Sequence, residues 1–436
     1  MAALLSGAVQ QAAHAQDPSE IPAARGPISV DEAVRLAMLK NHDLLSNEQN
    51  IRAAAGRKAE ALQRYLPSLS ADLGFNRAFD GSVQIGAGQS IPSSVNTYTS
   101  SYVLSQNLVD WSAFKSIQSA KHSKTATEFD YRAARGDLVL AVKQQYYALV
   151  ATQLLETVAD SSLVVAQQEL RRVESLFELG MVARGDVLKA KVRVSEAQLE
   201  VLRARGNVVN ERARLARIIG QNPTDDLHAD DRIGEVGPVA VDSVAIFNEA
   251  VSRRPELMRA QETVEAANAS VGAAKAGYYP TLGGQLAYRG SREQDFSLSG
   301  SRSRSLGIGL SIPVFDAFWG QKGRIQQSQA DREQARYAFQ RQRLDVEVEV
   351  REAINIARTA NEGVLVARDG LDSAEEDLKL SQEKYNVGSG TILELIDAQV
   401  ALQRARSNLV QALTEQRIAE ARIERVRGVE YVVPEE

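Results

Sequence analysis

The chain has 436 residues, of which 44% are hydrophobic and 25% are charged, with a formal net charge of −5. We find no uninterrupted run of about 18–20 apolar residues, the length that a membrane-spanning helix needs, which argues against a helical transporter. With no cysteine, the chain has no disulfide scaffold, thiolate metal site or lipidated N-terminal Cys. The scattered basic residues give no reason to expect a nucleic-acid partner.

The first residues predict export. Ala2–Ala15 is apolar and rich in small residues, and Ala13-His14-Ala15 before Gln16 fits a small-x-small cleavage site. We interpret residues 1–15 as the remnant of a signal peptide that lacks its basic start; an ordinary N-terminal segment is the alternative. Export and the absence of cysteine suit a bacterial envelope protein.

The positions of proline divide the chain. No proline occurs in Ser93–Asn222 or in Val314–Val433, and both runs are rich in Ala, Leu, Gln, Glu, Arg and Lys. Because proline costs about 3 kcal/mol inside a helix, these runs predict long helices. The segments 66–110 and 278–315 are instead rich in Gly, Ser, Thr and Tyr, which predicts β-hairpins.

The sequence is also an internal duplication. Ile117–Gly220 aligns without a gap with Ile325–Gly428, and the identical pairs include Arg135/Arg343, Asp137/Asp345, Gly180/Gly388 and Gly220/Gly428. Each half therefore predicts helices, a β-hairpin and a long helical hairpin. We expect this order: signal remnant 1–15, helices 16–65, β-hairpin 66–110, helical hairpin 111–220, linker and helices 221–277, β-hairpin 278–315, helical hairpin 316–428, and tail 429–436.

Four segments of about 10–13 residues alternate apolar and polar side chains, the period of a strand. Their apolar positions are Leu69, Ala71, Leu73, Phe75; Tyr98, Tyr102, Leu104, Leu108; Leu282, Leu286, Tyr288; and Leu306, Ile308, Leu310, Ile312, Val314. Strands of a soluble sandwich are one interpretation, and outer-membrane strands with a polar lumen are the other. Small barrels start at about eight strands, so a barrel needs several chains. We expect surface loops at Gly81–Ser94 and Gly290–Arg304.

The predicted helices carry two adjacent apolar stripes. After Gly185, one stripe runs through Val187, Ala190, Val194, Ala197, Val201, Ala204 and Val208, and the other runs through Leu188, Val192, Ser195, Leu199, Leu202, Gly206 and Val209. One stripe predicts one coiled-coil partner, whereas two predict a partner on each side, as in a closed tube of helices. The core of a solid bundle is the alternative. A helix over Trp111–Leu179 would extend about 100 Å.

The tips of the two helical hairpins are the most distinctive segments. They read FELGMVARGDVL from Phe177 and YNVGSGTILELIDA from Tyr385, each with a glycine at the turn and an acidic residue opening the next helix. Together with the duplication and the β-hairpins, these tips resemble the TolC family of outer-membrane efflux proteins over residues 28–428. The resemblance implies a trimer with a 12-stranded outer-membrane β-barrel and a 12-helix periplasmic tube, an α+β membrane fold.

The resemblance also implies roles for single residues. Glu394 and Asp397 match an acidic ring that narrows the tube entrance and binds cations, and Asp186 and Tyr385 match a pair that helps to hold the helices closed. Taken alone, the acidic residues would be helix caps. Six carboxylates around a threefold axis should have raised pKa values or bind cations. No structural metal and no cofactor are expected.

Two positions depart from the family pattern, which has Arg at Gly390 and Thr at Gly185, so a second latch is absent and Gly390→Arg should restore it. The segments that meet a periplasmic adaptor in the family match residues at both tips: Leu179, Gly180, Met181, Val182, Val387, Gly388 and Ser389.

The resemblance implies an exit duct of a tripartite efflux or type I secretion system in the Gram-negative outer membrane. Its expected partners are two further copies of the chain, a periplasmic adaptor, an inner-membrane pump of the resistance-nodulation or ATP-driven class, and outer-membrane lipid. A periplasmic coiled-coil adaptor or scaffold is the alternative, although an adaptor should carry one helical hairpin between compact β-domains. An enzyme has little support, because the sequence has no phosphate-binding loop, His-Glu-x-x-His or Gly-x-Ser-x-Gly motif.

Overall fold

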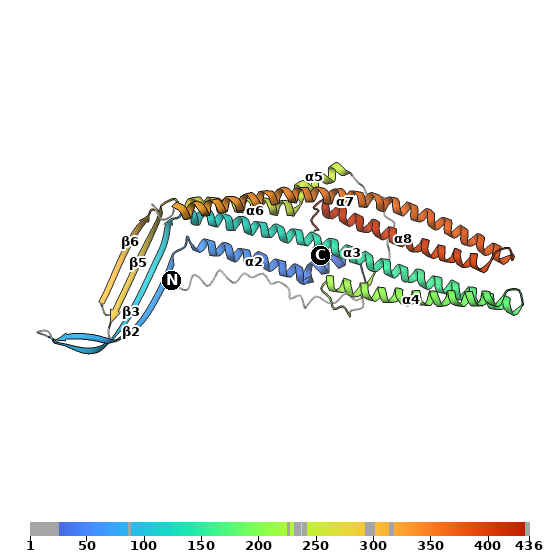
Figure 1. Ribbon diagram of the computed structural model, residues 1–436, viewed down its shortest axis with the longest axis horizontal. Coiled ribbons are helices and arrows are strands. Elements are labelled where there is room, and N and C mark those ends of the chain that lie inside the picture. Colours follow the sequence, from blue (N-terminus) through green and yellow to red (C-terminus); the bar gives the residue numbers. More distant parts are fainter. Residues whose placement is uncertain are drawn as a thin grey trace. The chain divides into compact units, whose positions relative to one another are not determined.

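A computed structural model of the chain describes residues 26–85, 89–224, 227–230, 237, 242–292, 301–313 and 318–431 (Figure 1). The predicted signal remnant, residues 1–15, lies outside these residues. The elements are β1 (Gly26–Ile28), α1 (Val30–Lys40), α2 (His42–Gln63), β2 (Ser68–Ile85), β3 (Gln89–Val109), α3 (Trp111–Glu178), α4 (Arg184–Ile218), β4 (Leu227–Ala229), α5 (Ser243–Arg253), α6 (Pro255–Ala276), β5 (Thr281–Arg292), β6 (Ser301–Ser311), α7 (Phe318–Asn386) and α8 (Ile392–Val426).

The helices of the two halves correspond one to one. The pair α1 and α5 has 11 residues each, α2 and α6 have 22 each, and α4 and α8 have 35 each. The two long helices, α3 and α7, have 68 and 69 residues. The duplication is therefore confirmed in the fold, and the helix predicted over Trp111–Leu179 is confirmed to within one residue.

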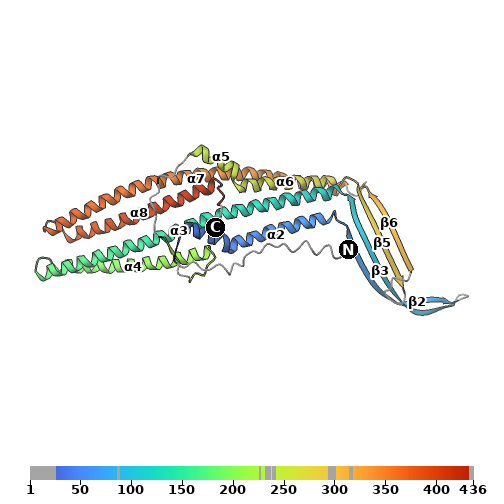
Figure 2. The same ribbon diagram turned by 180° about the vertical axis from the view of Figure 1, so that it is seen from behind.

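Each long helix turns back on the next, so that α3 lies beside α4 and α7 beside α8 in both views (Figure 2). At the first turn, Gly180 has a φ of 73°, its amide donates to the carbonyl of Phe177, and the amide of Met181 donates to that of Leu176, both at 2.9 Å. This is a Schellman ending, which needs the left-handed backbone that glycine adopts at no steric cost. A φ of 73° recurs at Gly220 and Gly388 and a φ of 71° at Gly428, and the same two types of hydrogen bond form at these three helix ends.

The chain divides into two compact units. The first comprises Tyr131–Pro255, Leu344–Glu436 and the chain up to Asn47. Its largest core lies where α1, α3 and α4 meet the parallel pair of β1 and β4, and the Tyr146 hydroxyl donates to the Ile28 carbonyl at 3.0 Å. The buried core residues are Ile28, Ala33, Val34, Leu36, Ala37, Val142, Tyr146, Leu149, Val150, Val208, Leu215, Ala216, Ile219, Leu227 and Ala229.

The first core accounts for only part of the apolar character of α3, because 17% of its apolar window is buried within the chain. By length and composition alone, α3 is the one helix among the described residues that could cross a membrane, with a window of mean hydropathy 1.3. The criterion used on the sequence, an uninterrupted apolar run, was too strict to detect this helix. Val142, Leu149 and Val150 of α3 are buried against the elements of the first core, which explains these side chains as packing residues.

The second unit, Glu48–Asp130 and Glu256–Arg343, contains a four-stranded antiparallel sheet in the order β2-β3-β5-β6. The length expected for the first two strands was wrong, since β2 has 18 residues and β3 has 21. The loop expected at Gly81–Ser94 was wrong for the same reason: the ladder resumes after a bulge and pairs Gly81 with Ser93 through to Ile85 with Gln89. In the sequence, Val83 and Ile85 continue the two-residue period of Leu73 and Phe75, and the Gly and Ser content concealed it.

The connection between β5 and β6 is shorter than the loop expected at Gly290–Arg304. Strand β5 continues to Arg292 and β6 starts at Ser301, so both ends of the expected loop belong to the sheet. Residues 293–300 between them lie outside the described residues. As with the first hairpin, a Gly- and Ser-rich composition does not exclude strand pairing, because the paired backbone makes the same hydrogen bonds with any side chain.

The register places whole rows of residues on one face of the sheet. Leu69, Leu104, Leu286 and Leu306 pair in sequence across all four strands, and Ser68, Ser105, Gln285 and Gly307 form the neighbouring row on the other face. The predicted alternation is therefore confirmed. The apolar face is uncovered within the chain, where Leu69 is 72% and Leu306 is 78% exposed. Strands β2 and β6 each pair on one side only among the described residues, so the sheet has two open edges.

Candidate functional site at the helical hairpin tips

The two turns of the helical hairpins expose apolar side chains to solvent. Leu179 is 74%, Met181 is 70% and Val387 is 78% exposed. The glycines Gly180 and Gly388 are also exposed, and the Ser389 hydroxyl donates to the Lys384 carbonyl at 3.2 Å, so the serine stabilises its own turn. Such exposed apolar residues at the end of a long hairpin form a surface suited to another protein.

Directly behind the turns, an apolar cluster joins the four helices of the two hairpins, α3, α4, α7 and α8. Its buried members are Val173 of α3, Val187 of α4 and Ile392 of α8. Partly buried residues pack around them: Leu170, Val182, Tyr385 and Ile396. Val182, which the resemblance assigned to the docking segment, therefore packs against this tip cluster. The cluster holds the ends of the two hairpins together within one chain.

Tyr385 lies at the edge of the tip cluster beside a basic side chain. The Arg172 guanidinium lies over the Tyr385 ring, 5.2 Å from its centroid, and also donates a hydrogen bond to the side-chain carbonyl of Asn386. Arg172 belongs to α3 and the other two to α7, so this contact joins the first hairpin to the second. Sequence reasoning missed Arg172. The position that matches Arg172 in the second half is Leu380. An arginine that occurs in only one of the two repeats was therefore the available signal.

Asp186 and Tyr385, the expected closure pair, lie close enough to interact electrostatically. Burial raises the pKa of the Tyr385 hydroxyl, and the carboxylates of Glu169 and Asp186 raise it further, against the opposing effect of Arg172. The Tyr385 hydroxyl is buried and has no hydrogen-bond partner among the described residues. The nearest cation to Asp186 is Lys189, at 3.5 Å. The structure thus brings the pair together without a hydrogen bond between them.

Glu169 is a buried acid next to this group. Burial raises its pKa, and Arg172, whose Nη1 lies 3.7 Å from its Oε2, lowers it. Its Oε1 is buried and has no hydrogen-bond partner among the described residues. An incompletely paired carboxylate favours its neutral form, since desolvation disfavours the charge.

Glu394 and Asp397, the expected acidic ring, are both exposed on the first turn and a half of α8. Glu394 forms a capping box with Thr391: its amide donates to the Thr391 hydroxyl at 3.2 Å, and its carboxylate accepts from the Thr391 amide at 3.4 Å. The helix-cap interpretation is therefore correct for Glu394 in a single chain, and it does not exclude a second role. The i, i+3 spacing places Asp397 near Glu394 on the helix surface.

The two positions that depart from the family pattern differ in the space around them. A Cβ at Gly185 would meet no atom within 4 Å, so Thr fits there. A Cβ at Gly390 would lie 3.0 Å from the Lys384 Cβ and 3.2 Å from the Tyr385 amide nitrogen. Gly390→Arg therefore requires a shift of a few tenths of an ångström in the turn as well as adding a cation. The latch that this substitution should restore stays a prediction.

Further along the hairpins, a buried polar cluster joins α3, α4 and α8. Arg193 is 7% exposed, and its Nη2 donates to the Gln403 Oε1 at 2.8 Å and to the Ser162 hydroxyl at 3.1 Å. The Ser162 hydroxyl in turn donates to the same Gln403 oxygen at 2.8 Å. Arg193 and Gln403 also line a groove of about 590 Å³ between the three helices. The cluster is a second polar connection between the hairpins that the sequence did not predict.

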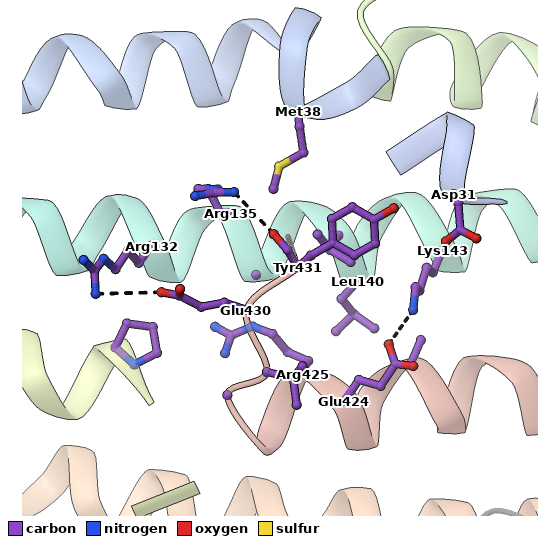
Figure 3. A pocket seen from close by; sticks show the side chains of 16 residues that line it. Asp31, Met38, Arg132, Arg135, Leu140, Lys143, Glu424, Arg425, Glu430 and Tyr431 are labelled. Carbon is purple, nitrogen blue, oxygen red and sulfur yellow. Dashed lines mark hydrogen bonds and ion pairs between the residues drawn. The ribbon is translucent and has the colours of Figure 1, made fainter. Parts of the chain in front are cut away.

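A cavity of about 410 Å³ lies under the last described residues, and its charged groups pair with one another (Figure 3). Arg132 lies 3.8 Å from Glu430, Lys143 pairs with Glu424, and Arg135 donates to the Tyr431 carbonyl at 3.4 Å. The contacts fasten the chain after α8 to α3. We therefore interpret this cavity as a structural junction rather than a binding site.

Comparison with known proteins agrees with this architecture. Residues 33–221 and 246–429 match the family model described as outer membrane efflux protein. The pyoverdine export outer membrane protein OpmQ of Pseudomonas aeruginosa is 26% identical over 88% of this chain and 82% of its own. The alkaline protease secretion protein AprF of the same species is 24% identical over 92% and 86%. The outer membrane channel CmeC of Campylobacter jejuni superposes with a TM-score of 0.81 at 17% identity, covering 93% of this chain and 87% of that one.

The family model covers the duplicated helices and both β-hairpins, and the fold agrees with a solved channel, which confirms the fold class predicted from the sequence. The same match decides against a periplasmic adaptor. The chain therefore belongs to the outer membrane efflux protein family, and it is an outer-membrane channel for efflux or secretion that extends into the periplasm.

Proposed function

We propose that three copies of the chain close the exit duct, with segments 66–110 and 278–315 forming the barrel. The supporting observation is the four-stranded sheet with an uncovered apolar face and two open edges, β2 and β6. Backbone groups in lipid must all be paired, so these edges must find partners in other chains. Three chains supply twelve strands, above the roughly eight that a small barrel needs. The duct itself is passive and has no catalytic activity.

The test is the state of the full chain in its own membrane. We expect trimers in the outer-membrane fraction that dissociate only on heating, and ion conductance after reconstitution into planar bilayers. A mature protein that is monomeric and soluble in the periplasm would contradict the proposal. A heat-resistant dimer would contradict the twelve-stranded barrel while leaving an outer-membrane location intact.

We propose that the entrance lies at the helical hairpin tips and that Glu394 and Asp397 line it as an acidic ring. In a trimer, six carboxylates would face a common axis, and such crowding favours cation binding. Divalent cations added on the tip side should therefore reduce the conductance, and Glu394→Gln with Asp397→Asn should abolish the block. Glu178→Gln, which removes an exposed acid from the other tip, is the matched control. Equal block in the double variant would leave Glu394 as a helix cap only.

We propose that the exposed apolar tip residues bind the periplasmic adaptor of the export system. Leu179, Met181 and Val387 supply the apolar surface. Met181→Asp and Val387→Asp should reduce adaptor crosslinking, whereas Val244→Asp, at an equally exposed position on α5, should not. Loss of crosslinking in none of the tip variants would place the adaptor elsewhere.

We propose that the cargo is selected by an inner-membrane pump of the resistance-nodulation or ATP-driven class. The names of the two relatives cover both a small molecule and a secreted protease, so they do not separate the classes. A crosslinked pull-down from native membranes, followed by mass spectrometry, would identify the pump. Recovery of no inner-membrane protein would contradict a tripartite system.

A further inference from the structure

A group of arginines lies on the apolar face of the sheet, at the end away from the helices. Arg304 pairs in register with Tyr288, which pairs with Tyr102, so the three residues form one row across β6, β5 and β3. Arg302 follows one row further out on β6, and Arg77 lies on the same face of β2, in register with Asn96. We define Arg77, Arg302 and Arg304 as the outer arginine cluster, in which Arg302 and Arg304 are neighbours on β6 and Arg77 lies two same-face rows further out on the opposite edge strand, β2.

Aromatic residues order two of the three guanidinium groups of this cluster. The Arg304 guanidinium lies 5.9 Å from the centroid of the Tyr288 ring, and the rings of Tyr288 and Tyr102 are 6.3 Å apart. On β2, the guanidinium of Arg77 lies 5.2 Å from the centroid of the Phe79 ring. Cation–π contacts of this kind hold an arginine side chain against the sheet and leave its N–H groups free to bind a ligand.

The cluster lies where a membrane interface is expected. Starting from the strand ends nearest the helices, β6 presents Leu310, Ile308 and Leu306 before Arg304 and Arg302. Outer-membrane barrels have an apolar band about 25 Å high that ends in aromatic residues at each interface. The row of Tyr102 and Tyr288 has this character. Because the strands start at the helices, the cluster marks the outer interface (Figure 1).

The charges that the structure describes on this face are of one sign. Among the residues whose side chains the structure describes, the apolar face of the four strands carries no acidic side chain; Asp72 lies on the opposite face with Ser70 and Asn76. All three arginines of the cluster are exposed. Guanidinium groups bind phosphate oxygens in pairs of parallel hydrogen bonds, so a phosphate group is the ligand that fits them.

We propose that the outer arginine cluster binds the phosphate groups of lipid A in the outer leaflet of the outer membrane. The inference rests on the proposed barrel, since only a closed barrel turns this face toward lipid. Arginine stems can lie along the apolar surface while their guanidinium groups reach the headgroup layer. The bound lipids would anchor each chain at a fixed depth in the membrane.

The experiment uses the full-length trimer in detergent with bisphosphorylated lipid A, counting bound lipid by native mass spectrometry. Arg302→Gln with Arg304→Gln should weaken binding on the order of tenfold, the size expected for basic residues at an anionic lipid surface. Arg289→Gln is the matched control, because Arg289 lies on β5 one residue from Tyr288 but on the opposite face, in register with Ser101 and Ser303.

Three results would overturn the inference: equal lipid A binding by the double variant, an equal loss in Arg289→Gln, or equal binding of dephosphorylated lipid A by the wild type. Binding of inorganic phosphate as tightly as lipid A would instead assign the site to free phosphate and overturn the lipid. Trimer content and conductance are measured on the same samples. Conducting trimers with no dependence on the arginines overturn this inference alone, whereas the absence of trimers overturns the proposed barrel.

Discussion

The two ends of each helical hairpin close with the same glycine turn but in different surroundings. The Schellman glycines of the tips, Gly180 and Gly388, have no atom within 4 Å of the position where a Cβ would lie. Those at the other ends of the hairpins, Gly220 and Gly428, lie against the ends of α1 and α5. A Cβ at Gly220 would be 2.4 Å from the Lys40 carbonyl oxygen, and one at Gly428 would be 3.1 Å from the Arg253 carbonyl carbon.

This comparison separates two requirements for the same residue. At the tips, glycine is needed only for its backbone conformation, with φ near 73° at both turns. At the opposite ends, it is needed for conformation and also for close packing of a helix end against backbone. The duplication therefore repeats one turn, and the neighbours of each copy decide whether its glycine can be replaced. At the ends opposite the tips, Gly220 of the first half packs more tightly than Gly428 of the second.

The largest effect is expected at Gly220. Gly220→Ala places a Cβ against backbone that cannot move without displacing the end of α1, so we expect a loss of more than about 3 kcal/mol of stability or no folded trimer. Gly388→Ala should cost about 1 kcal/mol, the penalty of a left-handed backbone alone. Thermal unfolding of the detergent-solubilised trimer would measure both. Gly428→Ala should fall between them, and equal losses at all three positions would contradict the distinction.

The second effect concerns the polar cluster of Ser162, Arg193 and Gln403, which joins the two hairpins and has no counterpart at the duplicated positions. The positions that match Ser162, Arg193 and Gln403 in the other half are Gly370, Ala401 and Ser195, which cannot form it. Arg193→Met should cost about 1–3 kcal/mol, because Gln403 and Ser162 lose a buried partner. A double-mutant cycle with Gln403→Leu checks this, since the second change should cost less in the Met background. Additive losses would show that the three side chains are not coupled.

The fold was largely predictable because its signals are local or repeated. The absence of proline, the helix-forming composition and the gapless match of Ile117–Gly220 to Ile325–Gly428 indicated the long hairpins and their turns. The length of the first β-hairpin was not predictable from composition. Pairing of Gly81 with Ser93 and of Ile85 with Gln89 depends on backbone hydrogen bonds that Gly and Ser make as well as any residue.

The candidate site was only partly predictable. Resemblance indicated Tyr385 and Asp186, which do lie close together, but it could not indicate Arg172, because the partner of Tyr385 comes from α3, more than 200 residues earlier in the chain. Glu394 shows the opposite case: its capping box with Thr391 is local and follows directly from the Thr-x-x-Glu spacing. Contacts within one turn of helix follow from sequence, whereas contacts between hairpins require the packed structure.

A smaller effect is expected at Arg172, which joins the two tips. Arg172→Gln removes the cation over the Tyr385 ring and should cost about 1 kcal/mol. Because the contact joins α3 to α7, we expect a higher open probability in single-channel recordings. Arg171→Gln, at the neighbouring exposed position, is the control for the loss of charge. Currents that change equally in both variants would indicate a general electrostatic effect instead of a specific contact.

The smallest effect, and the one with a pH signature, is expected at Glu169. Burial raises the pKa of its carboxyl above the ordinary value of 4.5, so its charged form is disfavoured in the folded chain. Stability from the neutral acid is therefore fully present below the ordinary pKa and is lost as the pH rises through the raised pKa. Glu169→Gln should be more stable than the wild type at neutral pH, and the difference should shrink as the pH falls toward 4.5 and below. Melting temperatures of both proteins across this pH range would test the prediction. A gain in the stability of Glu169→Gln that persists at low pH must come from packing. A loss of stability at neutral pH would mean that the contact with Arg172 outweighs the cost of burial.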